Sequence, residues 1–465
     1  MKNLSAIILA AGKGTRMKSS VPKVLHRVSG LPMLAYPINV LKELKAGNVV
    51  VVVGHGADEV RRAFGTSGAG FVLQKEQLGT GHAVMCAMKG LKRVRGDVLI
   101  LSGDVPLLTV QTIKGLLKLH RAGGKNRPAL SLVTTIVDDP KGYGRVVRDE
   151  NGSVVRIVEE KDCSVPQKGI NEINAGVYLA EADFLRANIS KLGNRNAQGE
   201  YYLPDLVDLA ASAGRKVKAL THLNPNEVMG INNRVELAKA NRLMRLRKAE
   251  ELMYSGVTVV DPETAYIDSS VKVGPDTTIY PGVHIIGDTV IGSGCVVEEG
   301  VRISGSVIGD RSVVKSHSIV EDSVLGKEVV AGPFARLRPG NSISDGVRIG
   351  NFVEVKKSSI GKGSKANHLS YLGDSVIGSG VNIGAGTITC NYDGSSKHTT
   401  VIEDGAFIGS DTQLVAPVTV GRGAYVGSGT TVTKDVPPGS LVLTRAGEKV
   451  VEGWAARKRK KKKKR

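Results

Sequence analysis

A glycine-rich segment near the start of the chain carries residue types that bind phosphate. Residues 9–26 read LAAGKGTRMKSSVPKVLH, with Lys13, Arg16 and Lys23 among or just after the glycines. Backbone N–H groups in such a turn can surround an anion, and the basic side chains add positive charge. A P-loop spaces its glycines more widely, and a dinucleotide fingerprint has a third glycine where Met17 stands. The segment therefore predicts a phosphate-binding loop of another kind, with a solvated surface loop as the alternative.

Asp104 is a second residue with chemical potential. It lies in LSGDVPLL, at the end of an apolar run and two residues before Pro106. A carboxylate in this position can hold Mg²⁺, which prefers oxygen ligands and is shared with substrate phosphates. On position alone, an aspartate that caps a helix or closes a turn is the alternative interpretation.

His368 is the third candidate, in the segment GKGSKANHLSYLGD. A histidine can take up a proton near neutral pH, and this one is predicted beside a break in a repeat, where loops project and sites form. Arg338 and Lys356 bring charge suited to a sugar phosphate, and Tyr371 and Asn382 offer hydrogen bonds. The alternative is a structural histidine at a corner of the fold.

The first two candidates need a scaffold, and residues 1–230 predict an α/β domain. The apolar runs AIILA, NVVVVVG, DVLILSGD and ALSLVTTIV alternate with helix-like stretches. This alternation favours a mostly parallel sheet with helices on both faces. Ligands bind at the carboxyl ends of such strands, where the glycine-rich loop and Asp104 both fall. The first apolar run is too short to span a membrane and is interpreted as a buried strand, not a signal peptide.

Residues 232–255 lack Gly and Pro and predict a long helix. Asn232 or Asn233 could cap its start, and Gly256 follows its end. Such a helix would reach roughly 35 Å and would act as a rigid spacer. The predicted domains are 1–230, a helical linker at 231–255, and 256–465 with a basic tail at 457–465.

Residues 257–445 repeat an apolar residue at every sixth position. The register runs from Val273 to Ile303, slips, and resumes at Ile308 and Val314. It returns at Ile343, Ile349 and Val355, and once more from Ile402 to Val432. A period of six fits neither a helix nor simple strand alternation, and it is typical of a parallel β-helix with one inward side chain per flat face. A series of ordinary short strands is the weaker alternative.

Composition limits the class of partner. The net charge is +20, and the last nine residues, RKRKKKKKR, supply nine of those charges. The remainder suits anionic substrates and does not require nucleic acid. Because no aromatic residue interleaves with the run, a solvated disordered tail is predicted, with contact to anionic membrane or RNA as the alternative. Four widely spaced cysteines have no metal or redox spacing and indicate a reducing compartment, so the protein is expected to be cytoplasmic.

Six motifs in order carry a resemblance to a known family. LAAGKGTRM, PKVLH, QLGTGHA, GDVPLL, GYGR and INNR together resemble the sugar-1-phosphate nucleotidyltransferases. More closely, the chain up to its basic tail resembles the bacterial bifunctional N-acetylglucosamine-1-phosphate uridylyltransferases/glucosamine-1-phosphate acetyltransferases. The resemblance implies a Rossmann-like nucleotidyltransferase domain, a linker helix and a left-handed parallel β-helix of hexapeptide repeats. The implied product is UDP-N-acetylglucosamine, which feeds peptidoglycan and, where present, lipopolysaccharide.

For the first domain the resemblance implies that the sugar phosphate attacks the α-phosphorus of UTP and that pyrophosphate leaves. Arg16 and Lys23 would offset the developing charge, and Asp104 and Asn232 would hold Mg²⁺. Ser102 departs from the family, because an aromatic residue is expected there. The implied contacts are Leu9, Ala10, Ala11 and Gly12 to uridine and phosphates, Gln74, Gly79 and Thr80 to uracil, and Gly144, Glu159 and Asn174 to N-acetylglucosamine.

For the second domain the resemblance implies acetyl transfer from acetyl-CoA to glucosamine-1-phosphate, with His368 removing the amine proton. The segment NIGAGTITCNYDG resembles the acetyltransferase signature of the family, and the β-helices of the family form trimers with a shared site. Ser428 stands where alanine is usual, and the sequence drifts from the family after Arg445. The implied contacts are Arg338, Lys356, Tyr371 and Asn382 to the sugar phosphate, and Ala385, Asn391, Tyr392, Ser410, Ser428 and Arg445 to acetyl-CoA.

Two other functions remain open at this point. One is a monofunctional sugar-1-phosphate nucleotidyltransferase whose β-helix is regulatory, and the intact neighbourhood of His368 speaks against it. The other is a non-catalytic interaction protein on the same folds, which should lack Arg16, Lys23 or Asp104, whereas all three are present.

Overall fold

The chain divides into two compact units. A computed structural model describes residues 3–91, 94–445 and 447–462. The first unit is Met1–Met244 and the second is Arg245–Arg465, so the boundary falls within helix α8 (Arg234–Tyr254). Each unit has its own hydrophobic core, and each is described by itself below.

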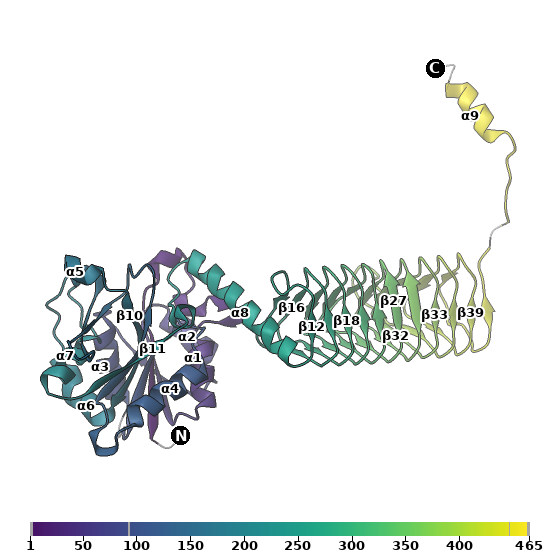
Figure 1. Ribbon diagram of the computed structural model, residues 1–465. Helices are drawn as coiled ribbons and strands as arrows, with labels where there is room; N and C mark the ends of the chain where they lie inside the picture. Colours follow the sequence, from purple (N-terminus) through teal and green to yellow (C-terminus); the bar gives the residue numbers. More distant parts are fainter. Residues whose placement is uncertain (1–2, 92–93, 446, 463–465) are drawn as a thin grey trace. The chain divides into compact units, whose positions relative to one another are not determined.

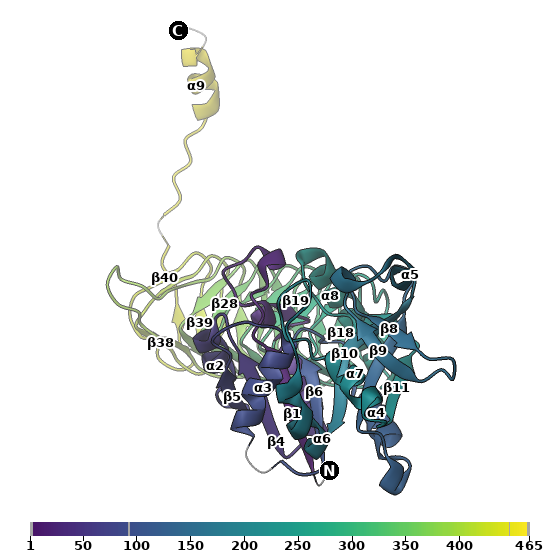
Figure 2. The same cartoon turned by 90° about the vertical axis from the view of Figure 1, so that its left-hand side faces the viewer.

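A mixed sheet forms the centre of the first unit (Figure 2). Strand β1 (Leu4–Ala10), which contains the predicted AIILA run, lies between β4 (Asn48–Val53) and β6 (Asp97–Ser102) and is parallel to both. In spatial order the strands are β11 (Val217–His222), β7 (Leu130–Ile136), β10 (Glu172–Glu181), β6 (Asp97–Ser102), β1 (Leu4–Ala10), β4 (Asn48–Val53) and β5 (Gly70–Leu73).

The sheet is less parallel than the sequence predicts. Strand β10 is antiparallel to both of its neighbours, β6 and β7. The reason lies in the antiparallel pair β8 (Arg145–Arg148) and β9 (Val154–Val158), which branches from the sheet where β8 pairs with β10. Antiparallel pairs can be joined by a short turn, whereas parallel strands need a crossover connection. The chain therefore re-enters the sheet in the opposite direction.

Helices cover both faces of this sheet, as predicted. Successive residues of β1 point to opposite faces, so Ile7 joins one core cluster and Ile8 the other. The cluster of Ile7 includes residues of α3 (Thr80–Gly90), α6 (Ala182–Asn188) and α7 (Asp205–Ser212). The cluster of Ile8 includes residues of α1 (Ala35–Glu43), α2 (Ala57–Phe64) and α4 (Val110–Arg121).

The predicted long helix is α8, which begins two residues after Asn232. Asn233 caps it, because its Oδ1 accepts a hydrogen bond from the backbone N–H of Glu236 at 2.9 Å. The carboxylate of Glu236 in turn accepts from the backbone N–H of Asn232 at 2.6 Å. This exchange fixes the segment that carries Asn232 against the start of the helix.

The second unit is the predicted left-handed β-helix of hexapeptide repeats (Figure 1). Three parallel sheets of 11, 10 and 9 short strands run along it. The first sheet begins at β12 (Thr258–Val259), the second at β13 (Tyr266–Ile267) and the third at β14 (Lys272–Val273). Each strand pairs with the strand one coil later, so each coil contributes one strand to every sheet.

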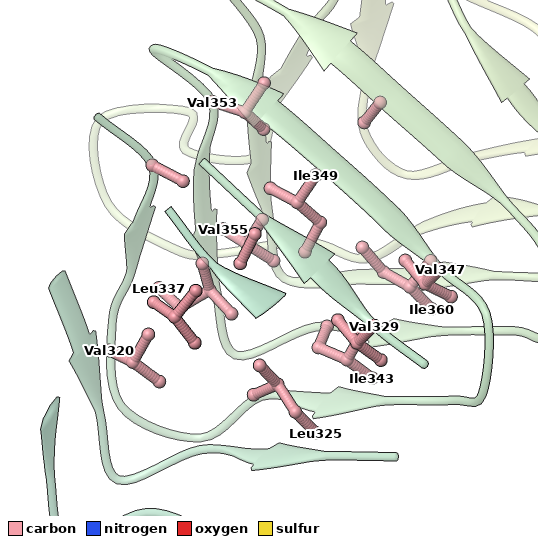
Figure 3. Packing of buried hydrophobic residues seen from close by; sticks show 14 of the residues in the cluster. Val320, Leu325, Val329, Leu337, Ile343, Val347, Ile349, Val353, Val355 and Ile360 are labelled. Carbon is pink, nitrogen blue, oxygen red and sulfur yellow. The ribbon is translucent and has the colours of Figure 1, made fainter. Parts of the chain in front are cut away.

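The inward side chains stack into a continuous core (Figure 3). Ile343, Ile349 and Val355, three residues of the predicted six-residue register, are at most 2% exposed. Burial of a Val, Leu or Ile side chain contributes about 1.5–3 kcal/mol relative to exposure. The repeat thus stabilises the unit one coil at a time, with each coil shielding the next.

The surroundings of His368 differ from the prediction. His368 does not adjoin a projecting loop, because it ends the regular strand β30 (Lys365–His368), which pairs with β27 (Arg348–Asn351) and β33 (Asn382–Ile383). The projecting segment is 391–399, between β34 (Ile388–Cys390) and β35 (Thr400–Ile402). The glycine-rich stretch before His368 therefore turns a corner of the coil without interrupting the stack.

The basic tail is predicted to be disordered, but its described part belongs to helix α9 (Trp454–Lys462), in which residues 454–459 are exposed. Alanine, lysine and arginine have high helix propensity, which explains the helix. Residues 463–465 of the predicted tail lie outside the described residues. Among the described residues, no helix is both long enough and apolar enough to cross a bilayer.

Candidate active sites

The glycine-rich loop lines a cavity at the carboxyl ends of β1 and β6. The cavity has a volume of about 460 Å³. Gly14 has a φ of +60°, and an added Cβ there would lie 2.7 Å from Cβ of Lys23, so glycine lets the loop close onto that residue. The cavity lining includes Leu9, Ala10, Ala11, Gly12, Lys23, Gln74, Gly79, Thr80 and Asp104 from the predicted set.

Lys23 joins the two predicted magnesium ligands. Its ammonium group donates to the carboxylate of Asp104 and, at 2.8 Å, to Oδ1 of Asn232. Arg16 donates to the same Oδ1 at 2.9 Å. Four polar residues from distant parts of this unit therefore converge, with two cations facing two oxygen donors. Among the described residues, no group of three or more His, Cys, Asp or Glu side chains is placed to hold a metal.

The three residues assigned to the amino sugar also come together. Asn174 donates its backbone N–H to the carbonyl of Gly144 at 2.9 Å. A Cβ on Gly144 would lie 3.2 Å from the carboxylate of Glu159, so the backbone there passes close to the acid. Burial, followed by the nearby charges of Asp162 and Asp205, raises the pKa of Glu159. The carboxylate of Glu159 therefore takes up a proton at a higher pH than an exposed glutamate does.

Glu159 also lines a second cavity of about 530 Å³ with Asp162, Asp205 and Asp208. Burial and the neighbouring charge of Asp208 raise the pKa of Asp205 to about 6. Sequence reasoning missed this carboxylate group, since half of it lies in the segment 159–162 and the other half in helix α7. It also missed Gln77 and Glu200, which line the first cavity. Gln77 stands inside the QLGTGHA motif, which was the available signal.

In the second unit, His368 is held by one neighbour. Its Nδ1 lies 3.2 Å from Oδ1 of Asn351, the residue paired with it on β27. An amide oxygen can only accept, so Nδ1 carries the proton and Nε2 is left with its lone pair. His368 is exposed, so Nε2 is accessible to a substrate amine. Asn351 was not predicted, because register alone, not spacing in the sequence, brings it to His368.

The basic and polar side chains assigned to the sugar phosphate lie mostly along a second sheet, which contains β31 (Tyr371–Gly373), the strand that follows β30 in the chain. Arg338 pairs with Glu354 of β28 (Glu354–Lys356) at 3.0 Å, and Glu354 is the ladder partner of Tyr371. Lys356 interacts with Lys397 of the projecting segment and lowers the pKa of that ammonium group. Two ammonium groups held together form a natural anion site, and sequence reasoning missed Lys397.

The residues assigned to acetyl-CoA fall into two groups. Ala385, Ser410 and Ser428 occupy one corner of successive coils: the carbonyl of Ala385 accepts from Asp411, and that of Ser410 accepts from Gly429. Asn391 is buried and its Nδ2 donates to Asp374 at 2.5 Å, whereas Tyr392 is exposed. Asn382 begins β33, one coil beyond Lys365. Arg445 is exposed beyond the last strand, β41 (Leu441–Val442).

Known protein families match each of the two units of the chain. The MobA-like NTP transferase domain matches residues 6–135. The GMPPB C-terminal domain matches residues 255–341, and the bacterial transferase hexapeptide (six repeats) matches residues 399–434. The fold and its sites thus define a nucleotidyltransferase carried on one chain with a hexapeptide transferase.

Full-length relatives give the family. The chain is 51% identical over 460 residues to the bifunctional protein GlmU of Geotalea uraniireducens, covering 99% of this chain and 100% of the relative. It is 53% identical to that of Pelobacter propionicus (99% and 100%) and 48% identical to that of Heliobacterium modesticaldum (99% and 99%). The chain belongs to the GlmU family of bifunctional proteins. It is a uridylyltransferase and an acetyltransferase of UDP-N-acetylglucosamine synthesis.

Proposed function

We propose that the first unit transfers UMP from UTP to N-acetylglucosamine-1-phosphate in the cavity behind the glycine-rich loop. A phosphate oxygen of the sugar forms a bond to the α-phosphorus, and the bond to pyrophosphate breaks. The substrate supplies the nucleophile, so the protein contributes position and charge. Lys23 and Arg16 neutralise the negative charge that develops on the α-phosphate.

Asp104 and Asn232 would hold Mg²⁺. Their oxygens already face a cation, the ammonium group of Lys23, and a carboxylate with an amide oxygen is a donor set that suits this metal. When bound, Mg²⁺ neutralises phosphate charge and fixes the phosphates for in-line attack. Lys23 would then turn from the two oxygens towards the phosphate.

The remaining contacts in this unit define the substrate. Leu9, Ala10, Ala11 and Gly12 would hold uridine and phosphates along the loop. Gln74, Gly79 and Thr80 line the same cavity and would contact uracil. Gly144, Glu159 and Asn174 would hold the hydroxyls and the acetamido group, which implies that acetylation comes before uridylyl transfer.

The second unit would acetylate glucosamine-1-phosphate. The sugar amine attacks the thioester of acetyl-CoA, the new C–N bond forms, and coenzyme A leaves as the thiol. Nε2 of His368 takes the amine proton, and Asn351 keeps that nitrogen free to do so. Arg338, Lys356, Tyr371 and Asn382 would hold the sugar phosphate.

Acetyl-CoA would lie along the corner formed by Ala385, Ser410 and Ser428. Main-chain groups at this corner would hydrogen-bond the pantetheine amides, so a serine in place of alanine is no obstacle. The remaining predicted contacts are Asn391, Tyr392 and Arg445.

A homotrimer would complete the acetyltransferase site. The rings of His317, Phe334 and Phe352 stack on one corner of the β-helix, with centroids 5.3 and 5.4 Å apart. Phe352 is 56% exposed and Leu369, one coil further, is 65% exposed. This apolar ladder reaches Leu369, which adjoins His368, so a second subunit covering it would also enclose the reacting amine.

The observation that carries this proposal is that one chain holds two separate reacting groups, Lys23 with Asp104 and Asn232, and His368 with Asn351. Pyrophosphate release should require UTP, N-acetylglucosamine-1-phosphate and Mg²⁺. Thiol release should require only acetyl-CoA and glucosamine-1-phosphate. Thiol release that depends on UTP, or pyrophosphate release that persists with EDTA, would contradict the assignment.

A further inference from the structure

The side-chain amide of Gln74 is held in one orientation. Gln74 follows β5, is 3% exposed and lines the first cavity. Its Nε2 lies 3.1 Å from the carbonyl oxygen of Gly79 and 3.1 Å from Nδ1 of His82. A carbonyl can only accept a hydrogen bond, so the group facing Gly79 must be the NH₂ group.

This geometry also fixes the tautomer of His82. Because the NH₂ of Gln74 donates, Nδ1 of His82 must accept, and the neutral ring carries its proton on Nε2. Nε2 lies 3.7 Å from the thiol sulfur of Cys86, one turn further along α3. A sulfur can accept a weak hydrogen bond, so the proton on Nε2 has a partner.

The start of α3 is locked in place, which keeps His82 beside Gln74. The backbone N–H of Gly81 donates to the carbonyl of Tyr201 at 2.8 Å. An added Cβ on Gly81 would lie 2.9 Å from the same oxygen, so the two segments are as close as glycine allows. The ring centroids of Tyr201 and His82 are 6.2 Å apart.

Both N–H groups of the Gln74 amide thus donate to acceptors within the protein. The amide oxygen, Oε1, remains available to accept a hydrogen bond from a ligand. In the described part of the chain, no residue donates a hydrogen bond to this oxygen. Uracil presents an N3–H donor on its pairing edge, whereas cytosine presents a bare N3 acceptor there. An oxygen held in this orientation accepts from the first base and repels the second.

We propose that His82 is a positioning residue for base selection: it fixes the amide of Gln74 so that Oε1 faces the nucleotide and selects uracil over cytosine. The proposal rests on the assignment of Gln74 to uracil made above. A polar group that is fixed before binding discriminates more strongly than one that can turn over, because the wrong base then leaves buried polar atoms unpaired.

The test compares His82→Leu with His82→Gln. Leucine removes the acceptor, whereas glutamine can present an oxygen to the Gln74 amide. His82→Leu should lower the UTP-over-CTP ratio of kcat/KM by roughly tenfold, mainly through the KM for UTP, and His82→Gln should stay within about threefold of the unaltered protein. Acetyl transfer, measured on the same preparations, should not change.

Two results separate the possible failures. If Gln74→Ala leaves the UTP-over-CTP ratio unchanged, the assignment of Gln74 to uracil is wrong. If Gln74→Ala lowers the ratio but His82→Leu does not, only the role of His82 is overturned. Nitrogen NMR of the unaltered protein with ¹⁵N-labelled histidine adds a check that needs no variant: an unprotonated Nδ1 in His82 supports the proposal, and a protonated Nδ1 contradicts it.

Discussion

The ammonium group of Lys23 bridges Asp104 and Asn232, donating to the carboxylate of the first and, at 2.8 Å, to Oδ1 of the second. Asp104 follows β6, Asn232 precedes α8 and Lys23 follows the glycine-rich loop, so three separate segments meet at one cation. The same two oxygens are the proposed magnesium ligands. Lys23 therefore ties these three segments of the site together.

Asp104→Asn should abolish uridylyl transfer and spare acetyl transfer. The change removes one negative charge from the metal site while keeping its shape, so the uridylyltransferase kcat should fall by roughly a hundredfold or more. Parallel assays of pyrophosphate release and thiol release on one preparation measure both activities. Loss of both activities in a folded protein would show that the two sites are not separate.

His368→Ala should have the reverse effect. Without Nε2 the attacking amine loses its proton acceptor, so the acetyltransferase kcat should fall by roughly a hundred- to a thousandfold. Uridylyl transfer from supplied N-acetylglucosamine-1-phosphate should be unchanged. An acetyltransferase rate close to normal would leave His368 as a structural residue.

Asn351 should act through His368. Asn351→Leu removes the acceptor that holds Nδ1–H, so the acetyltransferase kcat should fall by roughly tenfold with little change in the KM for acetyl-CoA. Asn351→Asp keeps an acceptor and adds a negative charge, which favours the protonated imidazole and should move the acidic limb of the pH–rate profile to higher pH. An unmoved profile in the aspartate variant would contradict a contact between the two side chains.

Asp205 should make the first unit less stable as pH rises. Its pKa is raised from 3.8 to about 6, so the folded state holds the proton more tightly than the unfolded state does. Stability therefore falls as pH rises from about 4 to about 6, and the full penalty is present above that range. Asp205→Asn should stabilise the protein by about 1 kcal/mol at pH 8, allowing for solvent screening, and by almost nothing at pH 4.

Thermal melts at the two pH values measure this difference. Asp183→Asn is the matched control, because the Asp183 side chain is 93% exposed on the neighbouring helix α6. It should change the melting temperature little at either pH. A larger gain for Asp205→Asn at pH 4 than at pH 8 would reverse the expected sign.

Gly350→Ala should disrupt the coil that carries His368. A Cβ on Gly350 would lie 1.9 Å from the backbone oxygen of Asn367, so β27 and β30 would have to separate. We expect a loss of about 3 kcal/mol or more and loss of acetyl transfer. Gly447→Ala, where nothing lies within 4 Å of the added Cβ, should be neutral and serves as the control.

The features of the fold that depend on a local sequence pattern could be predicted from the sequence. The six-residue period placed Ile349 and Val355 in the core, and the apolar run AIILA placed the glycine-rich loop at the end of β1. Asn351, Lys397 and His82 were not found, because each acts through a partner that the fold, and not spacing in the sequence, brings near. The antiparallel direction of β10 was missed for a related reason: strand direction depends on connections, not on composition.

Mass spectrometry of a single reaction tests the central claim most directly. Purified protein receives glucosamine-1-phosphate, acetyl-CoA, UTP and Mg²⁺, with no other enzyme present. We predict a UDP-N-acetylglucosamine peak that requires all four components. If no acetylated sugar forms, while added N-acetylglucosamine-1-phosphate still gives the nucleotide sugar, the β-helix is a scaffold and the acetyltransferase assignment is wrong.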